Sequence, residues 1–229
     1  MIEYGYASHA GMHRHHNEDT YCADAAQAVF VVVDGMGGPG HGEAAAALAR
    51  DRLHQDLRAG AALVAALQAA SQSIRTHAEA YPGRAPIGAS AAVLRIREDV
   101  FELAWIGGCR ILGAPATLFV DAPPGTTMIE AAALPAVDDT APCRASATQA
   151  LGLTAAESLT ICTRSGRCTS GQSVLLCTDG LGEHVEPERI AAVLARTDLS
   201  PQECVDHLLL AALDNGARDN LTALLVRIR

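Results

Sequence analysis

Acidic residues recur in this sequence where an apolar run meets a tight turn. The apolar segment Val29–Val33 leads directly into an Asp-Gly pair, and the segment Ser173–Cys177 reaches another one residue later. Several carboxylates that converge at the ends of buried strands are costly to desolvate unless cations neutralise them. One Asp-Gly pair alone can be a simple turn signal, but here the pattern repeats. The acidic segments are Asn17-Glu18-Asp19, Asp34-Gly35, Asp179-Gly180 and Asp219-Asn220.

Ligands of this type indicate which cation the chain would hold. Carboxylates without accompanying clusters of cysteine or histidine favour Mg²⁺ or Mn²⁺ over zinc. The seven cysteines include no Cys-x-x-Cys pair, and we expect them to be small buried side chains in a reducing cytoplasm. The sequence therefore predicts an enzyme that works with carboxylate-bound divalent cations.

The composition excludes several other kinds of chemistry. All 17 basic residues are arginine, so there is no lysine for a Walker-type phosphate loop, a kinase nucleotide site or a Schiff base. The net charge of −9 disfavours non-specific binding of nucleic acid. The sequence shows neither a basic-then-apolar leader nor an apolar run of the ~20 residues that a membrane span needs, so we expect a cytoplasmic protein with no membrane contact. Its 229 residues, 49% of them hydrophobic, predict a single domain over 1–229.

Hydrophobic periodicity predicts the elements that must position the acidic residues. Apolar runs and alternation predict strands at residues 29–33, 90–97, 100–106, 110–112, 158–163, 173–177 and 221–228. Helical spacing predicts helices at residues 43–57, 61–80, 187–195 and 201–213. Residues 121–147 show little periodicity and are predicted to form an irregular loop. Because strands cluster and helices come in pairs, the pattern favours an α+β sandwich over a doubly wound fold.

Four short motifs, taken in order, resemble those of a known enzyme family. They are Arg14-His15-His16-Asn17-Glu18-Asp19, Val33-Asp34-Gly35-Met36-Gly37-Gly38, Cys177-Thr178-Asp179-Gly180-Leu181 and Ala217-Arg218-Asp219-Asn220-Leu221-Thr222. Each is weak alone, but the ordered set is similar to the metal-dependent protein phosphatases, the PPM or type 2C family. The resemblance extends from Arg14 to Val226 and is closest to compact bacterial-type members.

The resemblance implies a fold, a cofactor and a reaction. The fold would be a four-layer αββα sandwich, with two antiparallel sheets flanked by pairs of antiparallel helices. Two Mg²⁺ or Mn²⁺ ions would activate a bridging water for direct attack on phosphoserine or phosphothreonine of a protein. The physiological partner would be a kinase or its target in a signalling pathway, and the enzyme would be a monomer.

The resemblance also assigns roles to individual residues. Asp34 would bridge both ions, with Asp179 and Asp219 completing the shell of one of them. Glu18 and the carbonyl of Gly35 would serve the other ion. Asp19 would orient the water, and Arg14 would hold the substrate phosphate, for which a guanidinium offers a bidentate contact.

One departure from the family pattern concerns a third ion. The family commonly has Gly-Asp-Ser-Arg after the central hairpin, where this chain has Gly107-Gly108-Cys109-Arg110. Gly108 therefore removes a carboxylate that contributes to a third metal, and Glu183 is the remaining candidate ligand for a weak third site.

Several alternatives stay open from the sequence. His13, His15 and His16 either form a solvated loop cluster or provide a proton for the leaving group. Residues 121–147 would form a reduced flap. The chain could be a catalytically weak pseudophosphatase, a phosphoprotein-binding module or a small-molecule phosphoesterase, although a binding module has no need of four costly carboxylates.

Overall fold

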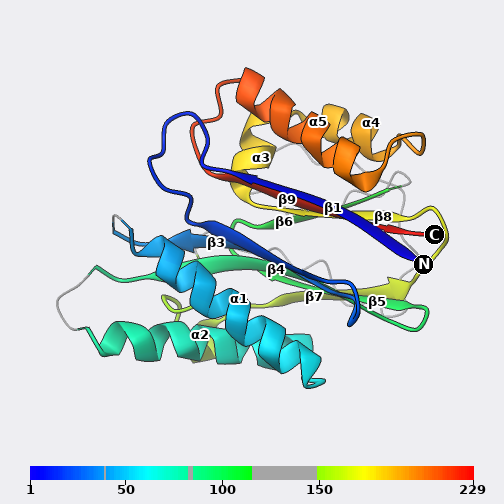
Figure 1. Ribbon diagram of the computed structural model, residues 1–229. Coiled ribbons are helices and arrows are strands. Elements are labelled where there is room, and N and C mark those ends of the chain that lie inside the picture. The colour runs from blue at the N-terminus through cyan, green and yellow to red at the C-terminus, as the bar shows by residue number, and fades with distance from the viewer. Residues whose placement is uncertain (39, 82–84, 115–148) are drawn as a thin grey trace.

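The computed structural model describes residues 1–38, 40–81, 85–114 and 149–229. Two antiparallel sheets face one another, and helices cover both outer faces (Figure 1). One sheet has the strand order β1-β9-β8-β6 and the other β2-β3-β4-β5-β7. The strands are β1 Ile2–His9, β2 Asp19–Asp24, β3 Val29–Met36, β4 Gly88–Arg97, β5 Val100–Ile106, β6 Arg110–Ala114, β7 Cys162–Arg167, β8 Ser173–Cys177 and β9 Leu221–Ile228. The helices are α1 Gly42–Arg58, α2 Leu63–Glu79, α3 Asp179–His184, α4 Pro187–Leu194, α5 Pro201–Asp214 and a 3-10 turn at Ala156–Ser158.

Both sheets are buried on both faces, which explains the uninterrupted apolar runs Val29–Val33 in β3 and Val174–Cys177 in β8. In β3, Val29, Val31 and Val33 pack in the cluster beneath α1 and α2, whereas Phe30 and Val32 pack between the sheets. Successive side chains of a strand point to opposite faces, so a strand between two layers needs apolar residues at every position. This arrangement confirms the α+β sandwich, with three helices rather than a pair on the four-stranded sheet (Figure 1).

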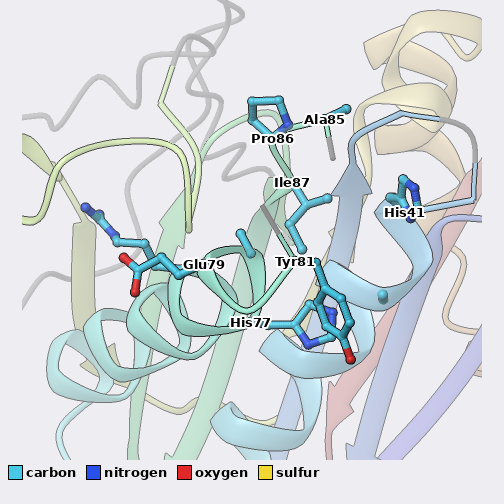
Figure 2. Close-up of a pocket in the computed structure, with 10 residues that line it drawn as sticks. His41, His77, Glu79, Tyr81, Ala85, Pro86 and Ile87 are labelled. Atoms are coloured by element: carbon cyan, nitrogen blue, oxygen red, sulfur yellow. The ribbon is translucent and has the colours of Figure 1, made fainter. Parts of the chain in front are cut away.

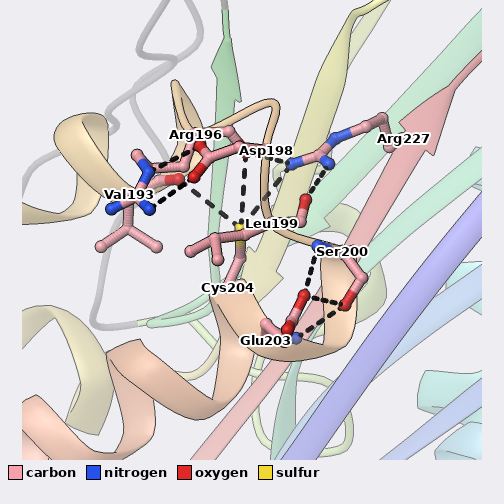
Figure 3. A network of polar contacts seen from close by, with 8 residues as sticks. All are labelled: Val193, Arg196, Asp198, Leu199, Ser200, Glu203, Cys204 and Arg227. Atoms are coloured by element: carbon pink, nitrogen blue, oxygen red, sulfur yellow. Dashed lines mark hydrogen bonds and ion pairs between the residues drawn. The ribbon is translucent and has the colours of Figure 1, made fainter.

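A buried arginine ties the α4–α5 connection to the four-stranded sheet. Arg227 of β9 is 1% exposed, and its guanidinium donates to the carbonyls of Leu199, at 2.6 Å, and Arg196, at 3.2 Å. The guanidinium also lies 3.6 Å from Cys204 Sγ (Figure 3) and donates to Ser173 Oγ at 3.1 Å, a residue that the figure does not draw. No carboxylate of the described residues forms an ion pair with it. Backbone carbonyls near the end of α4 therefore carry most of the stabilisation of this charge.

The structure corrects several predicted elements. Strands β1 and β2 and helix α3 were not predicted, and the strand placed at 158–163 begins only at Cys162. Cys162 is disulfide-bonded, so the expectation of reduced thiols is wrong there. Five other cysteines are free, at positions 22, 109, 168, 177 and 204. The predicted loop at 121–147 lies outside the described residues. None of the described helices is long and apolar enough to cross a membrane.

Strands β1 and β9 bring the two ends of the sequence together. They pair antiparallel from Ile2 opposite Ile228 to His9 opposite Leu221. As a result, the loop that follows β1 lies against the turn that precedes β9 (Figure 1). The first and last acidic motifs, about 200 residues apart in sequence, thereby become neighbours.

Candidate metal centre

A cleft of about 690 Å³ collects the four acidic motifs. It lies where β3 ends, where α3 and β9 begin, and beside the loop between β1 and β2. Four predicted ligand side chains and the backbone of Gly35 therefore share one cavity. Its lining residues are His13, Arg14, His15, His16, Glu18, Asp34, Gly35, Met36, Gly37, Gly40, Asp179, Asp219 and Asn220.

Asp34 lies at the centre of the negative charge. It is near the end of β3, paired across the sheet with Asp19 of β2 on one side and Ser90 of β4 on the other. Burial raises the pKa of Asp34 well above its usual range, and the charges of Asp19 and Asp179, among other carboxylates, raise it further. A carboxylate in this position is stabilised by a cation rather than by more protein groups.

Asp19 lies beneath the cleft rather than in its wall. It is 9% exposed and accepts a hydrogen bond from Thr178 Oγ1 at 2.8 Å. Burial raises its pKa to about 7, although the hydrogen bond from Thr178 acts in the opposite direction. Thr178 Oγ1 also accepts from the backbone N–H of Thr222 at 3.0 Å, so β2, β8 and β9 are joined at this point. Sequence reasoning did not identify Thr178, because a threonine before Asp-Gly has no distinctive signal.

Glu18 is held by the first turn of α1. The backbone N–H of Gly42 donates to Glu18 Oε1 at 3.2 Å. A Cβ atom on Gly42 would lie 2.6 Å from Glu18 Oε2, and one on Gly35 would lie 2.0 Å from the Gly42 carbonyl oxygen. Glycine at both positions therefore allows β3, α1 and Glu18 to approach closely. The Gly35 N–H also donates to the Glu18 carbonyl at 3.1 Å.

Asp179 and Asp219 come from the other sheet. Asp179 is the first residue of α3, and burial together with the charge of Glu183 raises its pKa. Asp219 accepts a hydrogen bond from the Asn220 N–H at 2.8 Å and forms an ion pair with Arg14, also at 2.8 Å. Arg14 thus lies at the mouth of the cleft and is paired with Asp219, one of the predicted metal ligands.

The structure places the residue that departs from the family pattern next to Asp179. A Cβ atom on Gly108 would lie 2.9 Å from Asp179 Oδ2, and the backbone of Gly108 is not in the left-handed region. A side chain at this position would therefore face Asp179. After burial, the charge of Glu183 is the next cause of the raised pKa of Asp179, but Glu183 does not line the cleft.

The donor set fits Mg²⁺ or Mn²⁺ in its chemistry. Its members are hard oxygen atoms, and four carboxylates raise the pKa of Asp34 together. Within the described residues, no three acidic, histidine or cysteine side chains already form a ready coordination sphere. The four carboxylates thus line one cleft without being clustered tightly around a single point.

A second cavity, of about 320 Å³, lies behind the turn that carries Gly37. A Cβ atom on Gly37 would lie 3.1 Å from Ile87 Cγ2 in its wall. Figure 2 shows the rings of His77 and Tyr81 close together at the end of α2, with their centroids 5.1 Å apart, and His41 at the start of α1. Glu79 is the one carboxylate among its described lining residues, so the metal chemistry belongs to the first cleft.

Known proteins match this chain in structure but not in sequence searches. Neither a family model nor a curated protein sequence matches this chain. PppA, titled a key regulatory component of T6SS in Pseudomonas aeruginosa, has a TM-score of 0.78 and 27% identity, covering 99% of this chain and 97% of that one. The Mycobacterium tuberculosis serine/threonine phosphatase PstP/Ppp also gives 0.78, with 24% identity and coverage of 100% and 99%.

A third solved structure is described directly as a PPM enzyme. The PPM Ser-Thr phosphatase MsPP from Mycobacterium smegmatis has a TM-score of 0.76 and 21% identity, covering 99% of this chain and 98% of that one. This chain has the PPM phosphatase fold. The fold that the four short motifs implied is thereby confirmed over the whole described chain. The PstP catalytic domain has also been solved in complex with two manganese ions.

Proposed function

We propose that this chain is a Mg²⁺- or Mn²⁺-dependent protein phosphatase that hydrolyses phosphoserine and phosphothreonine. The observation that carries the proposal is the convergence of acidic side chains from all four motifs on one cleft, with Arg14 at its mouth. The structural likeness to serine/threonine phosphatases over the whole chain supports the same reaction.

The proposed ligand sets are those that the resemblance to the metal-dependent protein phosphatases implies, and all of these residues line the same cleft. Asp34 would contact both ions from the end of β3. Asp179 and Asp219 would complete the shell of one ion, and Glu18 with the Gly35 carbonyl would serve the other. When bound, two such ions supply Lewis-acid stabilisation and a water nucleophile at neutral pH. The protein itself then needs no nucleophilic side chain.

The other residues of the site would bind the substrate phosphate and orient the water. The Arg14 guanidinium would hold the phosphate dianion through charge-assisted hydrogen bonds. Asp19, fixed by the hydrogen bond from Thr178, would orient the attacking water from below the cleft. Glu183 remains the candidate for a weak third site, in place of the carboxylate that Gly108 lacks.

We further propose the setting in which this reaction occurs. Residues 1–229 would act as one catalytic domain, and the substrate would be a phosphorylated kinase or its target protein. Neither nucleic acid nor a membrane would take part, because the negative net charge of −9 disfavours binding to phosphate-rich surfaces. The enzyme would work as a cytoplasmic monomer in signalling.

Phosphate release from a phosphothreonine peptide tests the proposal. The protein is treated with EDTA, dialysed and assayed with and without added Mn²⁺. We expect release only with Mn²⁺, and its loss in Asp179→Asn. The matched control is Asp206→Asn, which changes an exposed aspartate of α5.

Other outcomes would favour the alternatives. Peptide binding without phosphate release would indicate a phosphoprotein-binding module or a weak pseudophosphatase. Hydrolysis of a small phosphate ester, with no activity on phosphopeptides or phosphoproteins, would indicate a small-molecule phosphoesterase. Either outcome would overturn the proposed protein phosphatase.

A further inference from the structure

Asn220 connects the start of β9 to three points of the loop between β1 and β2. Its Nδ2 group donates to the carbonyls of Ala10 and His16, each at 2.9 Å. Its Oδ1 atom accepts from the Glu18 N–H at 2.8 Å. Both amide hydrogens and one oxygen lone pair are used, and the residue is only 7% exposed. This single carboxamide thus closes the Ala10–Glu18 loop at both of its ends.

The loop depends on this connection, because its own side chains are largely in solvent. Met12 is 62% exposed, and the Arg14 side chain is 57% exposed. The Met12 N–H donates to the Ala217 carbonyl at 2.8 Å, which places the loop on the turn before β9. The Arg14 guanidinium itself contacts Asp219. Without Asn220, the segment from Ala10 to Glu18 would lose three of its tertiary hydrogen bonds.

We propose that Asn220 is a positioning residue that holds the Arg14 guanidinium where a phosphate would bind. It would act through the backbone of the Ala10–Glu18 loop and would contact neither phosphate nor metal. The phosphate part of this inference rests on the proposed function, whereas the ordering of the loop does not. A fixed guanidinium loses less conformational entropy when it binds an anion, so phosphate affinity should depend on Asn220.

Limited proteolysis measures the order of the loop without any assay of activity. Because the chain has no lysine, trypsin cleaves it only after arginine. We expect Asn220→Ala to accelerate cleavage after Arg14 on the order of tenfold or more, since it removes three hydrogen bonds that hold the loop. Cleavage after Arg52, on the exposed side of α1, should stay unchanged.

Gln202→Ala is the matched control for this measurement. The Gln202 carboxamide also makes two backbone hydrogen bonds to an N-terminal segment, donating to the Tyr6 carbonyl at 2.9 Å and accepting from the Tyr6 N–H at 3.1 Å. It does not touch the Ala10–Glu18 loop, so cleavage after Arg14 should not change. Equal acceleration at Arg14 and Arg52 in Asn220→Ala would mean general unfolding and would overturn the proposal.

A double-mutant cycle tests the connection to phosphate. Asn220→Asp keeps the acceptor for Glu18 but loses both donors. We expect Arg14→Ala and Asn220→Asp each to weaken inhibition by inorganic phosphate on the order of tenfold. The double variant should be weakened little further, because both changes remove the same contact. Mn²⁺ affinity, measured by calorimetry, should change less than phosphate affinity.

The cycle separates positioning from simple charge repulsion. If the new carboxylate at position 220 merely repels phosphate, the two effects will add, and that outcome overturns the positioning role. If phosphate does not bind the wild-type protein at all, the proposed function fails, while faster cleavage after Arg14 would still support the loop-ordering part. Unchanged cleavage after Arg14 in Asn220→Ala would overturn the inference whatever the activity.

Discussion

Asp34 combines burial with the charges of four neighbouring carboxylates, so its replacement separates catalysis from stability. Asp34→Asn should reduce Mn²⁺-dependent turnover by more than tenfold, because contact with both ions would be lost at a cost of several kcal/mol. The same change should raise the melting temperature in EDTA, since burial and adjacent carboxylates oppose the charge of Asp34.

Two assays on the same Asp34→Asn preparation check this prediction. Phosphate release is measured in Mn²⁺, and thermal unfolding is followed in EDTA. Turnover above about a tenth of the wild-type value would contradict contact with both ions. A lower melting temperature in EDTA would contradict the electrostatic account of the site.

Gly108 allows the missing carboxylate to be restored. In Gly108→Asp, the new side chain would face Asp179, whose Oδ2 atom would lie 2.9 Å from the added Cβ, so Asp179 must shift slightly. We expect an additional Mn²⁺ ion to bind, because an oxygen ligand joins Asp179 and Glu183. Equilibrium dialysis gives the number of bound ions, and the Mn²⁺ dependence of turnover gives the functional effect.

Gly108→Asn is the matched control for this prediction. It brings the same crowding against Asp179 but no charge. If the Asp and Asn variants bind the same number of ions as the wild type, the absent carboxylate does not decide whether a third ion binds.

At the scale of elements, Arg227 connects β9 to the segment between α4 and α5. Arg227→Lys keeps the charge but loses the planar group that reaches Leu199 and Arg196 (Figure 3) and, at the same time, Ser173. Because at least one buried carbonyl would lose its donor, we expect unfolding free energy to fall by about 1–3 kcal/mol. Urea denaturation of Arg227→Lys measures the change.

Arg97→Lys is a suitable control for Arg227→Lys. The Arg97 guanidinium is exposed and makes one long contact, 3.4 Å, with the Gly60 carbonyl. Its replacement should shift the unfolding free energy by less than about 0.5 kcal/mol, as for most surface changes. Equal effects at both positions would contradict the role given to the buried network.

The elements that could be predicted from the sequence are those with a clear burial pattern. Strand β3 is apolar from Val29 to Val33 because this part lies between two layers, and α1 has a periodic apolar face. Strand β1 was missed because it is at an edge, where Tyr4 and Tyr6 are partly exposed and Gly5 packs against α5. Helix α3 is six residues long and contains two glycines, so no helical period could be detected.

In the candidate site, the residues with a local sequence signal were predicted, whereas contacts between distant segments were not. The carboxylates Asp34, Asp179 and Asp219 are signalled locally by the ends of strands, and the structure brings them to one cleft. The contacts of Asn220 were not predicted, because a side-chain amide that bonds distant backbone carbonyls leaves no pattern in the sequence. The first and last acidic motifs become neighbours only through the β1–β9 pairing, and the sequence does not show that these two strands pair.

At the scale of the whole molecule, buried acidic groups make stability depend on pH. Asp19 has a pKa of about 7 in the folded protein against an ordinary value of 3.8, so the folded state holds this proton more tightly than the unfolded state. The stabilisation is present below pH 4 and is lost as the pH rises towards 7. Its upper limit is about 4 kcal/mol, at 1.36 kcal/mol per pKa unit.

Melting temperatures in EDTA at pH 5.5 and pH 8 check this dependence. We expect the wild type to melt at a lower temperature at pH 8, and Asp19→Asn to show a smaller difference between the two values. Added Mn²⁺ should stabilise the protein more at pH 8, where the carboxylates are charged. An identical pH difference in Asp19→Asn would contradict the assignment to Asp19.

The pairing of β1 with β9 also has a consequence for synthesis on the ribosome. Strand β1 emerges more than 200 residues before its partner β9, so the four-stranded sheet cannot be completed until β9 has been made. The nascent chain must carry the unpaired strand β1 until then, a state prone to aggregation. Met1 and Arg229 are hydrogen-bonded to each other, at 2.8 and 3.0 Å, so a short linker could join the two ends. A circular permutant reopened between β7 and β8, which lie in different sheets, would turn the β1–β9 pairing into a local hairpin, and it should fold faster than the original order of the chain.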